Sequence, residues 1–334
     1  MDWGLALAGL IVGVVVGLTG MGGGALMTPI LVLVFKIEPL AAVSSDLVAS
    51  LFMKPVGAVV HLRRGTVNLE LVKWLCLGSV PCAFAGVFVL KALGGSQLQH
   101  RVTLALGYAL LIAALGLITK TYMNLRERAH RRATGQPSPY GPGTPPIVVR
   151  PLPTILIGAI GGLIVGMTSV GSGSLIIIAL IALYPALRAS NLVGTDLVQA
   201  VPLVAAAALG HVLYGDFRLS VTASLLVGCI PGVYVGARMS TGAPGGLVRR
   251  ALAFVLLASS LKLLGVSTDA LAWVLVVVAI GGSLVWMWVR SSHGLPPLAR
   301  TELRSRSAAA EPDATASAEP GPLVGRDGPN PPAG

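Results

Sequence analysis

The sequence predicts an all-α fold, a polytopic transmembrane helical bundle built from two related halves. Hydrophobic residues make up 54% of the 334 residues and charged residues only 11%, whereas a soluble domain carries about 25% charged residues. The chain therefore lacks the polar groups that a water-facing surface needs. Long apolar stretches alternate with short basic ones, and helices satisfy their own backbone hydrogen bonds within a bilayer.

The basic excess has a membrane explanation. The chain holds 24 Lys and Arg against 13 Asp and Glu, a net charge of +11. Such an excess also occurs in nucleic-acid-binding proteins, but in a membrane protein it marks cytoplasmic loops. We therefore expect a lipid bilayer and no nucleic acid as partner. Cys76, Cys82 and Cys229 lie in apolar segments, which indicates packing rather than a disulfide framework or a metal site.

Apolar segments define the elements that we expect. They are 4–19, 24–36, 39–62, 68–91 and 98–123, and then 153–168, 173–185, 188–213, 217–239, 246–265 and 268–290. The stretch between the two sets is basic and then rich in Pro and Gly, and the end of the chain is rich in Ala, Pro, Glu, Ser and Gly. We divide the chain into a first transmembrane repeat (1–123), a cytoplasmic linker (124–152), a second transmembrane repeat (153–266), an extra transmembrane helix (267–290) and a disordered cytoplasmic tail (291–334).

The two halves match each other in sequence. GLTGMGGGALMT (17–28) aligns with GMTSVGSGSLII (166–177) at an offset of 149, and VSSDLVAS (43–50) aligns with VGTDLVQA (193–200) at an offset of 150. The second offset then pairs His61 with His211 and Pro81 with Pro231. Matches of Asp, His and Pro in one register indicate a duplication rather than shared apolar composition.

The distribution of Lys and Arg predicts the orientation. The N-terminus is expected outside, and either every segment crosses or 4–19 and 24–36 form a re-entrant hairpin. In both cases the loop at Arg63 and Arg64, the linker and the C-terminus are cytoplasmic, as the positive-inside rule requires. The two halves then start from opposite sides of the membrane. This arrangement is an inverted-topology repeat, which is typical of secondary transporters.

A glycine run interrupts the first apolar stretch. Residues 4–36 would span about 50 Å as one helix, against a hydrocarbon core of about 30 Å. Gly20, Gly22, Gly23 and Gly24 lie in the middle, so we expect a Gly-interrupted helical hairpin whose turn is inside the membrane. The second helix would present its free N–H groups and positive dipole end to an anion. The alternative is that these glycines only allow close helix packing.

The second half repeats the interruption and adds hydroxyl groups. Paired interruptions at matching positions indicate a transporter binding site. Together with Thr19 and the glycine run, the candidate anion-binding residues here are Thr168, Ser169, Gly171, Ser172, Gly173 and Ser174.

Two aspartates occupy equivalent positions in the halves. Asp46 follows Ser45, and Asp196 follows Thr195. One interpretation is helix N-capping, which Ser, Thr and Asp all favour. The other is an intramembrane carboxylate that carries a coupling proton or shapes the cavity, since a charge at the bilayer centre is costly and usually functional.

Lys54 and His61 are seven residues apart and share a helix face. The histidine recurs as His211, but the lysine corresponds to Val204. A cation facing the interior would attract an anion, whereas the alternative is a lysine that snorkels to the boundary. For the histidines we favour structural hydrogen bonds at the membrane boundary over a role in the cavity.

These motifs resemble those of a known family. A half that begins G-x-T-G-x-G-G-G and continues with the Ser-Asp or Thr-Asp helix and His61 or His211 is similar to the TauE/SafE sulfite exporter family over about residues 5–266. The resemblance implies transport of a small anion such as sulfite or an organosulfonate across the bacterial inner (plasma) membrane, often as efflux. Ser169 and Ser172, where the first half has Gly20 and Gly23, leave the substrate open.

We therefore expect a secondary transporter and not an enzyme. The sequence has no nucleophile–base pair, metal-ligand spacing or phosphate-binding loop, so we expect neither a cofactor nor a metal. The expected partner is a small inorganic or organosulfur anion, and the oligomeric state is left open. The alternatives are a non-transporting membrane scaffold and a cation or proton pathway built on the two aspartates.

Overall fold

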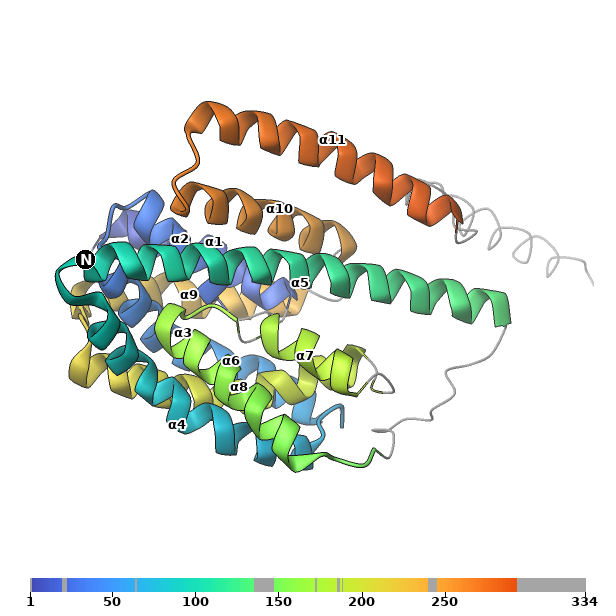
Figure 1. Cartoon of the computed structure of the whole chain (residues 1–334), viewed down its shortest axis with the longest axis horizontal. Coiled ribbons are helices and arrows are strands. Elements are labelled where there is room, and N and C mark those ends of the chain that lie inside the picture. The colour runs from blue at the N-terminus through green and yellow to red at the C-terminus, as the bar shows by residue number, and fades with distance from the viewer. Residues whose placement is uncertain are drawn as a thin grey trace, which may run out of the picture. The chain divides into compact units, whose positions relative to one another are not determined.

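The protein is all-helical in the computed structural model (Figure 1), as the sequence predicts. The structure describes residues 2–19, 23–63, 65–134, 147–171, 173–184, 187, 189–239 and 245–292. The helices are α1 (Trp3–Thr19), α2 (Gly24–Leu33), α3 (Pro39–Arg63), α4 (Leu69–Gly94), the 3₁₀ turn η1 (Gly95–Gln97), α5 (Leu98–Thr134), α6 (Pro151–Thr168), α7 (Leu175–Leu183), α8 (Ala189–Tyr214), α9 (Leu219–Met239), α10 (Gly245–Leu263) and α11 (Thr268–Ser292).

The chain divides into two units, Met1–Ile280 and Gly281–Gly334. The first unit contains every helix from α1 to α10 and the beginning of α11. In the second unit the structure describes only the rest of α11, which ends at Ser292. The predicted disordered tail lies almost wholly outside the described residues.

Most helices begin and end close to the predicted segments, but α5 is longer. It continues to Thr134, into the stretch that we assigned to the linker. The added residues are rich in Arg, Glu and Ala, which favour helix, and contain neither Gly nor Pro before Gly135. The part of the linker between 135 and 146 lies outside the described residues.

Each half opens with a helix pair that turns back on itself. In the first half, a methyl group on Gly4 of α1 would lie 3.2 Å from the ring of Phe35, which follows α2. The hydroxyl groups of Thr154, near the start of α6, and Tyr184, just after the end of α7, lie 2.7 Å apart. The start of α6 and the end of α7 are therefore side by side. In the turn, Ser169, Gly171 and Gly173 have φ angles of 59°, 123° and 99°, which are left-handed values that reverse the chain. The interruption that the sequence predicts is therefore a hairpin here.

Glycines let helices from different halves pack at very short range. A methyl group at Gly228 or Gly236 of α9 would overlap the carbonyl of Ala6 or Val14 of α1. The later residue of α9 contacts the later residue of α1, so α1 and α9 run parallel. In the same way, methyl groups at the α6 glycines 158, 162 and 166 would overlap carbonyls of α4 at positions 75, 79 and 83, so α4 and α6 also run parallel. Small residues at such interfaces are typical of membrane helices.

The third helices of the two halves, α3 and α8, run antiparallel. Ser44, near the start of α3, lies 2.9 Å from His211, near the end of α8. At the other end, a methyl group on Gly194 of α8 would lie 3.1 Å from Nδ1 of His61 of α3. Helices α4 and α8 run parallel, because Asn68 contacts Thr195 and Ser79 contacts Gln199. Of these directions, an inverted-topology repeat would need the antiparallel one, between the equivalent helices α3 and α8.

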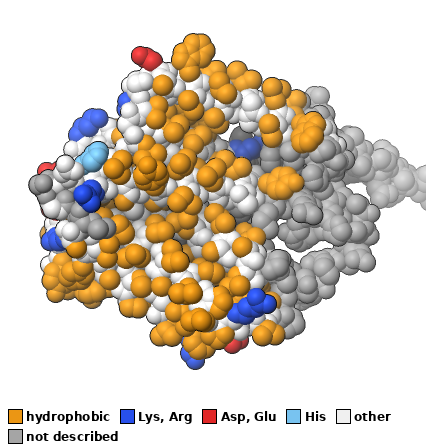
Figure 2. All heavy atoms as spheres, viewed as in Figure 1, with side chains coloured by type: hydrophobic (Ala, Val, Ile, Leu, Met, Phe, Trp, Pro, Cys, Tyr) orange, Lys and Arg blue, Asp and Glu red, His pale blue; other side chains and the backbone are white. Residues whose placement is uncertain are grey.

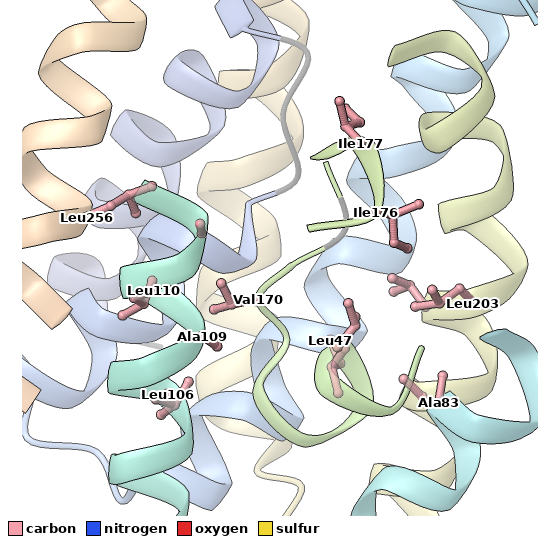
Figure 3. Close-up of a cluster of buried hydrophobic side chains, with 14 of the residues drawn as sticks. Leu47, Ala83, Leu106, Ala109, Leu110, Val170, Ile176, Ile177, Leu203 and Leu256 are labelled. Carbon is pink, nitrogen blue, oxygen red and sulfur yellow. The ribbon is translucent and has the colours of Figure 1, made fainter. Parts of the chain in front are cut away.

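The buried core and the apolar exterior fit a membrane protein. Figure 3 shows part of one buried cluster, in which Leu106 and Leu110 of α5, Val170 of the second turn and Leu203 of α8 are labelled. Hydrophobic side chains also cover most of the described part of the face in Figure 2. Among the described residues, Trp3 and Leu7 are large hydrophobic residues that are exposed. Six of the described helices, α3, α4, α5, α6, α8 and α9, are long and apolar enough to cross a membrane.

Candidate functional site

The start of α2 and the turn between α6 and α7 meet inside the bundle. A methyl group on Gly24, the first residue of α2, would overlap the backbone carbonyl of Ser169, which ends α6. Met53, in the middle of α3, packs against Gly23. Sequence reasoning placed both breaks in the membrane, and the structure brings them into contact beside α3.

Asp46 joins the two halves at this point. Its Oδ2 accepts hydrogen bonds from the hydroxyl of Thr28 in α2, at 2.7 Å, and from the hydroxyl of Ser169, at 2.8 Å. The side chain is fully buried. The hydroxyl of Ser50, one turn further along α3, lies near the carboxylate but outside hydrogen-bonding geometry. Asp46 therefore holds both hairpins against α3.

Lys54 is a buried cation close to the centre of the α3–α8 pair. Only 5% of the residue is exposed, and its charge interacts with those of both Asp46 and Asp196. The midpoint between the two end contacts of α3, at Ser44 and His61, falls at residues 52–53. Lys54 thus lies beside the axis that would relate the two halves, with one carboxylate from each half.

Asp196 is also buried, and the helix that carries it brings a further polar side chain. Gln199, fully buried one turn later on α8, accepts a hydrogen bond at Oε1 from the Ser79 hydroxyl of α4, at 3.0 Å. Sequence reasoning missed both Gln199 and Thr28. Neither residue carries a charge. Gln199 aligns with Ala49 and Thr28 aligns with Ile177, so neither polar side chain recurs in the other half.

The two histidines differ in burial and in partners. His61 is half-buried, and its Nδ1 lies 2.9 Å from the hydroxyl of Thr66 in the following loop. His211 is fully buried; its Nε2 donates to the Gly166 carbonyl of α6 at 2.6 Å, and its Nδ1 lies 2.9 Å from the Ser44 hydroxyl. His211 thus links α8 to α6 and α3.

The threonines that end the first helices bond within their own helices. The Thr19 hydroxyl donates to the Val15 carbonyl at 2.8 Å, and the Thr168 hydroxyl donates to the Ile164 carbonyl at 2.7 Å. Thr19 also lines a shallow, mainly apolar pocket between α1, α2 and α10. The anion-binding roles of both threonines stay predictions.

The remaining predicted site residues have different surroundings. The Thr195 hydroxyl accepts a hydrogen bond from the Asn68 backbone N–H at 3.1 Å, next to the start of α4. The buried Ser45 hydroxyl has no hydrogen-bond partner among the described residues, and Ser174 precedes α7 without a side-chain cap. Gly20, Gly22 and Ser172 lie outside the described residues.

An exposed ion-pair network closes one end of the α3–α8 interface. The Arg218 guanidinium lies 3.0 Å from both Glu38 and Asp216. Asp216, together with Glu38, raises the pKa of Arg218 above its ordinary value. At the opposite end the corresponding contacts are uncharged and involve His61, Thr66 and Asn68.

Comparison with known proteins agrees with this arrangement. The family model for the sulfite exporter TauE/SafE matches residues 5–263. The chain belongs to the TauE/SafE family. It is 38% identical over 267 residues to the probable membrane transporter protein YjnA of Bacillus subtilis (strain 168), covering 79% of this chain and 100% of the relative. No solved structure matches the chain.

A second relative has the same description at lower identity. The chain is 24% identical over 253 residues to the probable membrane transporter protein YdhB of Bacillus subtilis (strain 168), covering 74% of this chain and 94% of the relative. The protein is therefore a multi-pass membrane transporter of the TauE/SafE family. The matched region ends before α11, as the sequence resemblance also did.

Proposed function

We propose that the protein is a secondary transporter that binds a small oxyanion, such as sulfite or an organosulfonate, at the junction of its two hairpins and exports it. The observation that carries this proposal is Lys54, a buried cation whose charge interacts with one carboxylate from each half. A cation in a low-dielectric interior attracts an anion far more strongly than one in water does. The name of the family supports a small anion as the substrate.

The hairpins supply a second source of positive potential. Helices α2 and α7 begin at the two turns, at Gly24 and Leu175. Their first N–H groups and dipole ends favour an anion placed between 19–24 and 168–174. The contact between Gly24 and Ser169 supports a single site shared by the two turns.

The charges around Lys54 favour coupling to protons. With Asp46 and Asp196 ionised, the three side chains carry a net charge of −1, and a bound anion would bring the buried centre to −2. Uptake of a proton by Asp46 or Asp196 removes this penalty, since isolated buried charges are costly. Binding of the anion and binding of a proton are then linked, and one of these aspartates carries the coupling proton.

We infer that the two halves form an inverted-topology repeat in the bacterial inner membrane. The antiparallel α3–α8 pair and the parallel α1–α9 and α4–α6 pairs support it. Alternating access would come from rocking one half against the other around Lys54. The positions of Lys and Arg favour an outside N-terminus and a cytoplasmic linker and C-terminus.

A cation or proton pathway is the second candidate, because two buried carboxylates face one lysine. A third, a membrane scaffold, would explain the close glycine contacts of α1 with α9, but not a charged centre. The two transport candidates respond in opposite ways to changes of charge. An anion site tolerates Asp46→Asn better than Lys54→Glu, and a cation pathway tolerates Lys54→Glu better.

The experiment uses purified protein in liposomes loaded with radiolabelled sulfite. Because the anion and the proton bind together, we expect saturable sulfite efflux that an acidic liposome interior accelerates. Lys54→Glu should abolish this efflux, and Thr19→Val and Thr168→Val should weaken it. Undiminished flux in both threonine variants would remove these residues from the site. A panel that includes methanesulfonate and sulfate, measured in both directions, identifies the substrate and the direction of transport. A scaffold would give no flux with any of these anions.

A further inference from the structure

Gln199 presents a buried amide donor that the fold leaves without a partner. The residue is fully buried on α8, and its Nε2 forms no hydrogen bond among the described residues. A buried donor that lacks a partner costs about 1–3 kcal/mol. Nearly all buried polar groups in proteins are paired, so an exception calls for a ligand or another function.

The orientation of this amide is fixed from the other side. The Ser79 hydroxyl of α4 donates to Gln199 Oε1 at 3.0 Å, which holds the carbonyl end of the amide toward α4. The amide N–H groups therefore point away from Ser79. Ser79 is itself fully buried, so this hydrogen bond is shielded from water.

The register of the antiparallel pair places Gln199 at the level of Lys54. Gly57 of α3 packs against Leu197 of α8. One turn before Gly57 on α3 is Lys54, and the antiparallel direction sets it opposite the residues that follow Leu197. Gln199 also shares a helix face with Asp196, three residues earlier, whose charge interacts with that of Lys54.

We propose that Gln199 is a substrate-recognition residue whose amide N–H donates to an oxygen of the oxyanion bound at Lys54. This inference rests on the proposed function and adds to it a neutral donor from the second half, opposite the cation from the first half. Ser79 is then a positioning residue for the amide. The Ser50 hydroxyl, one turn before Lys54, lies near the Asp46 carboxylate and forms no hydrogen bond among the described residues, so it can supply a third donor to a three-oxygen head group.

The test measures sulfite transport by the reconstituted full chain. For Gln199→Ala, which copies Ala49 at the equivalent position of the first half, we expect KM for sulfite to rise by roughly tenfold to hundredfold, because a hydrogen bond to a charged group is lost. Vmax should change far less. Gln99→Ala is the matched control. It removes an amide that contacts Leu40 and Glu38, away from Lys54, and should leave KM unchanged.

Gln199→Glu tests whether the side chain of residue 199 must donate a hydrogen bond to the substrate. The side chain keeps its shape, but an ionised carboxylate only accepts hydrogen bonds and repels an anion, so we expect it to raise KM at least as much as Gln199→Ala does. Sulfite should also raise the melting temperature of the wild type and of Gln99→Ala but not of either Gln199 variant.

Three results would overturn the inference. An unchanged KM in folded Gln199→Ala, with only a lower melting temperature, would make the residue structural. Full transport by Gln199→Glu would show that no N–H is donated to the substrate. If the wild type transports none of the anions in the panel, the proposed function fails, and the inference fails with it.

Discussion

Asp46 and Asp196 occupy the same position in the two halves, yet their surroundings differ. Asp46 accepts hydrogen bonds from two hydroxyl groups, those of Thr28 and Ser169. The residue of the second half that matches Thr28 is Ile177, which has no hydroxyl. The duplication therefore preserved the backbone and the carboxylate, while the polar groups around it diverged.

The same divergence affects the centre of the bundle. Lys54 corresponds to Val204, and Gln199 corresponds to Ala49. Two identical halves would place two cations, or none, beside their common axis. In the site that we propose, the first half instead contributes one cation and the second half one amide. The comparison indicates that the proposed binding site needs both halves.

The largest expected effect is that of Lys54→Val, which makes this position match the second half. It leaves two buried carboxylates without their cation, and breaking a buried charge pair in this way costs about 3–5 kcal/mol. We expect a correspondingly lower free energy of unfolding in mixed detergent micelles. Adding Val204→Lys moves the cation to the equivalent position and should recover part of the loss. No recovery would contradict the equivalence of the two positions.

The two histidines give the next largest contrast. His211→Ala removes a fully buried ring that bridges α8 to α6 and α3, and we expect it to cost about 2–4 kcal/mol from lost packing and unpaired groups. His61→Ala removes a half-buried ring that contacts its own loop, and about 1 kcal/mol or less is expected. Thermal unfolding of both variants checks the order, and equal losses would contradict it.

Variants of Ser169 test the hydrogen bond that its hydroxyl donates to Asp46. Ser169→Ala removes one charge-assisted hydrogen bond, worth about 1.5–3 kcal/mol, but keeps a Cβ at a φ of 59°. Ser169→Gly removes the same bond and, since glycine adopts this conformation freely, regains about 1 kcal/mol. We expect the glycine variant to unfold at higher denaturant than the alanine variant. The reverse order would show that the Cβ of residue 169 stabilises the fold by packing more than its left-handed conformation costs. An alanine variant as stable as the wild type would show that the hydrogen bond to Asp46 contributes nothing.

Substitutions at the two ends of the α3–α8 interface are expected to change the free energy of unfolding least. Arg218→Gln removes an exposed ion-pair network whose expected contribution is at most about 1 kcal/mol and falls with salt. Because its neighbours raise the pKa of Arg218, the guanidinium stays charged and the effect should be constant between pH 6 and 9. Asn68→Ala, at the uncharged end, removes a helix cap worth about 1 kcal/mol that salt does not change. Equal salt dependence of the two variants would contradict this difference.

The helices could be predicted from the sequence because apolar length and the two glycine-rich interruptions determine where most of them begin and end. The interrupted pairs around Gly24 and Ser169 were evident for this reason. The extension of α5 to Thr134 was missed because its residues are charged, and charge was taken as the sign of a linker. Arg, Glu and Ala favour helix outside a membrane as well.

The candidate site could be predicted only in part. Asp46, Asp196 and Lys54 stood out because charges are rare in apolar segments. Thr28 and Gln199 did not, since uncharged polar residues are common in such helices. Their importance comes from contacts with α3 and α4 that depend on how the two halves pack, which no local pattern specifies.

The most direct test of the central claim is equilibrium binding of radiolabelled sulfite to the purified protein. We expect saturable binding of one sulfite per chain to the wild type. In Lys54→Val, shown to be folded by its helical content and elution volume, the affinity should fall at least about a hundredfold, because a desolvated charge pair is lost. An unchanged affinity in this variant would contradict an anion site at the buried lysine.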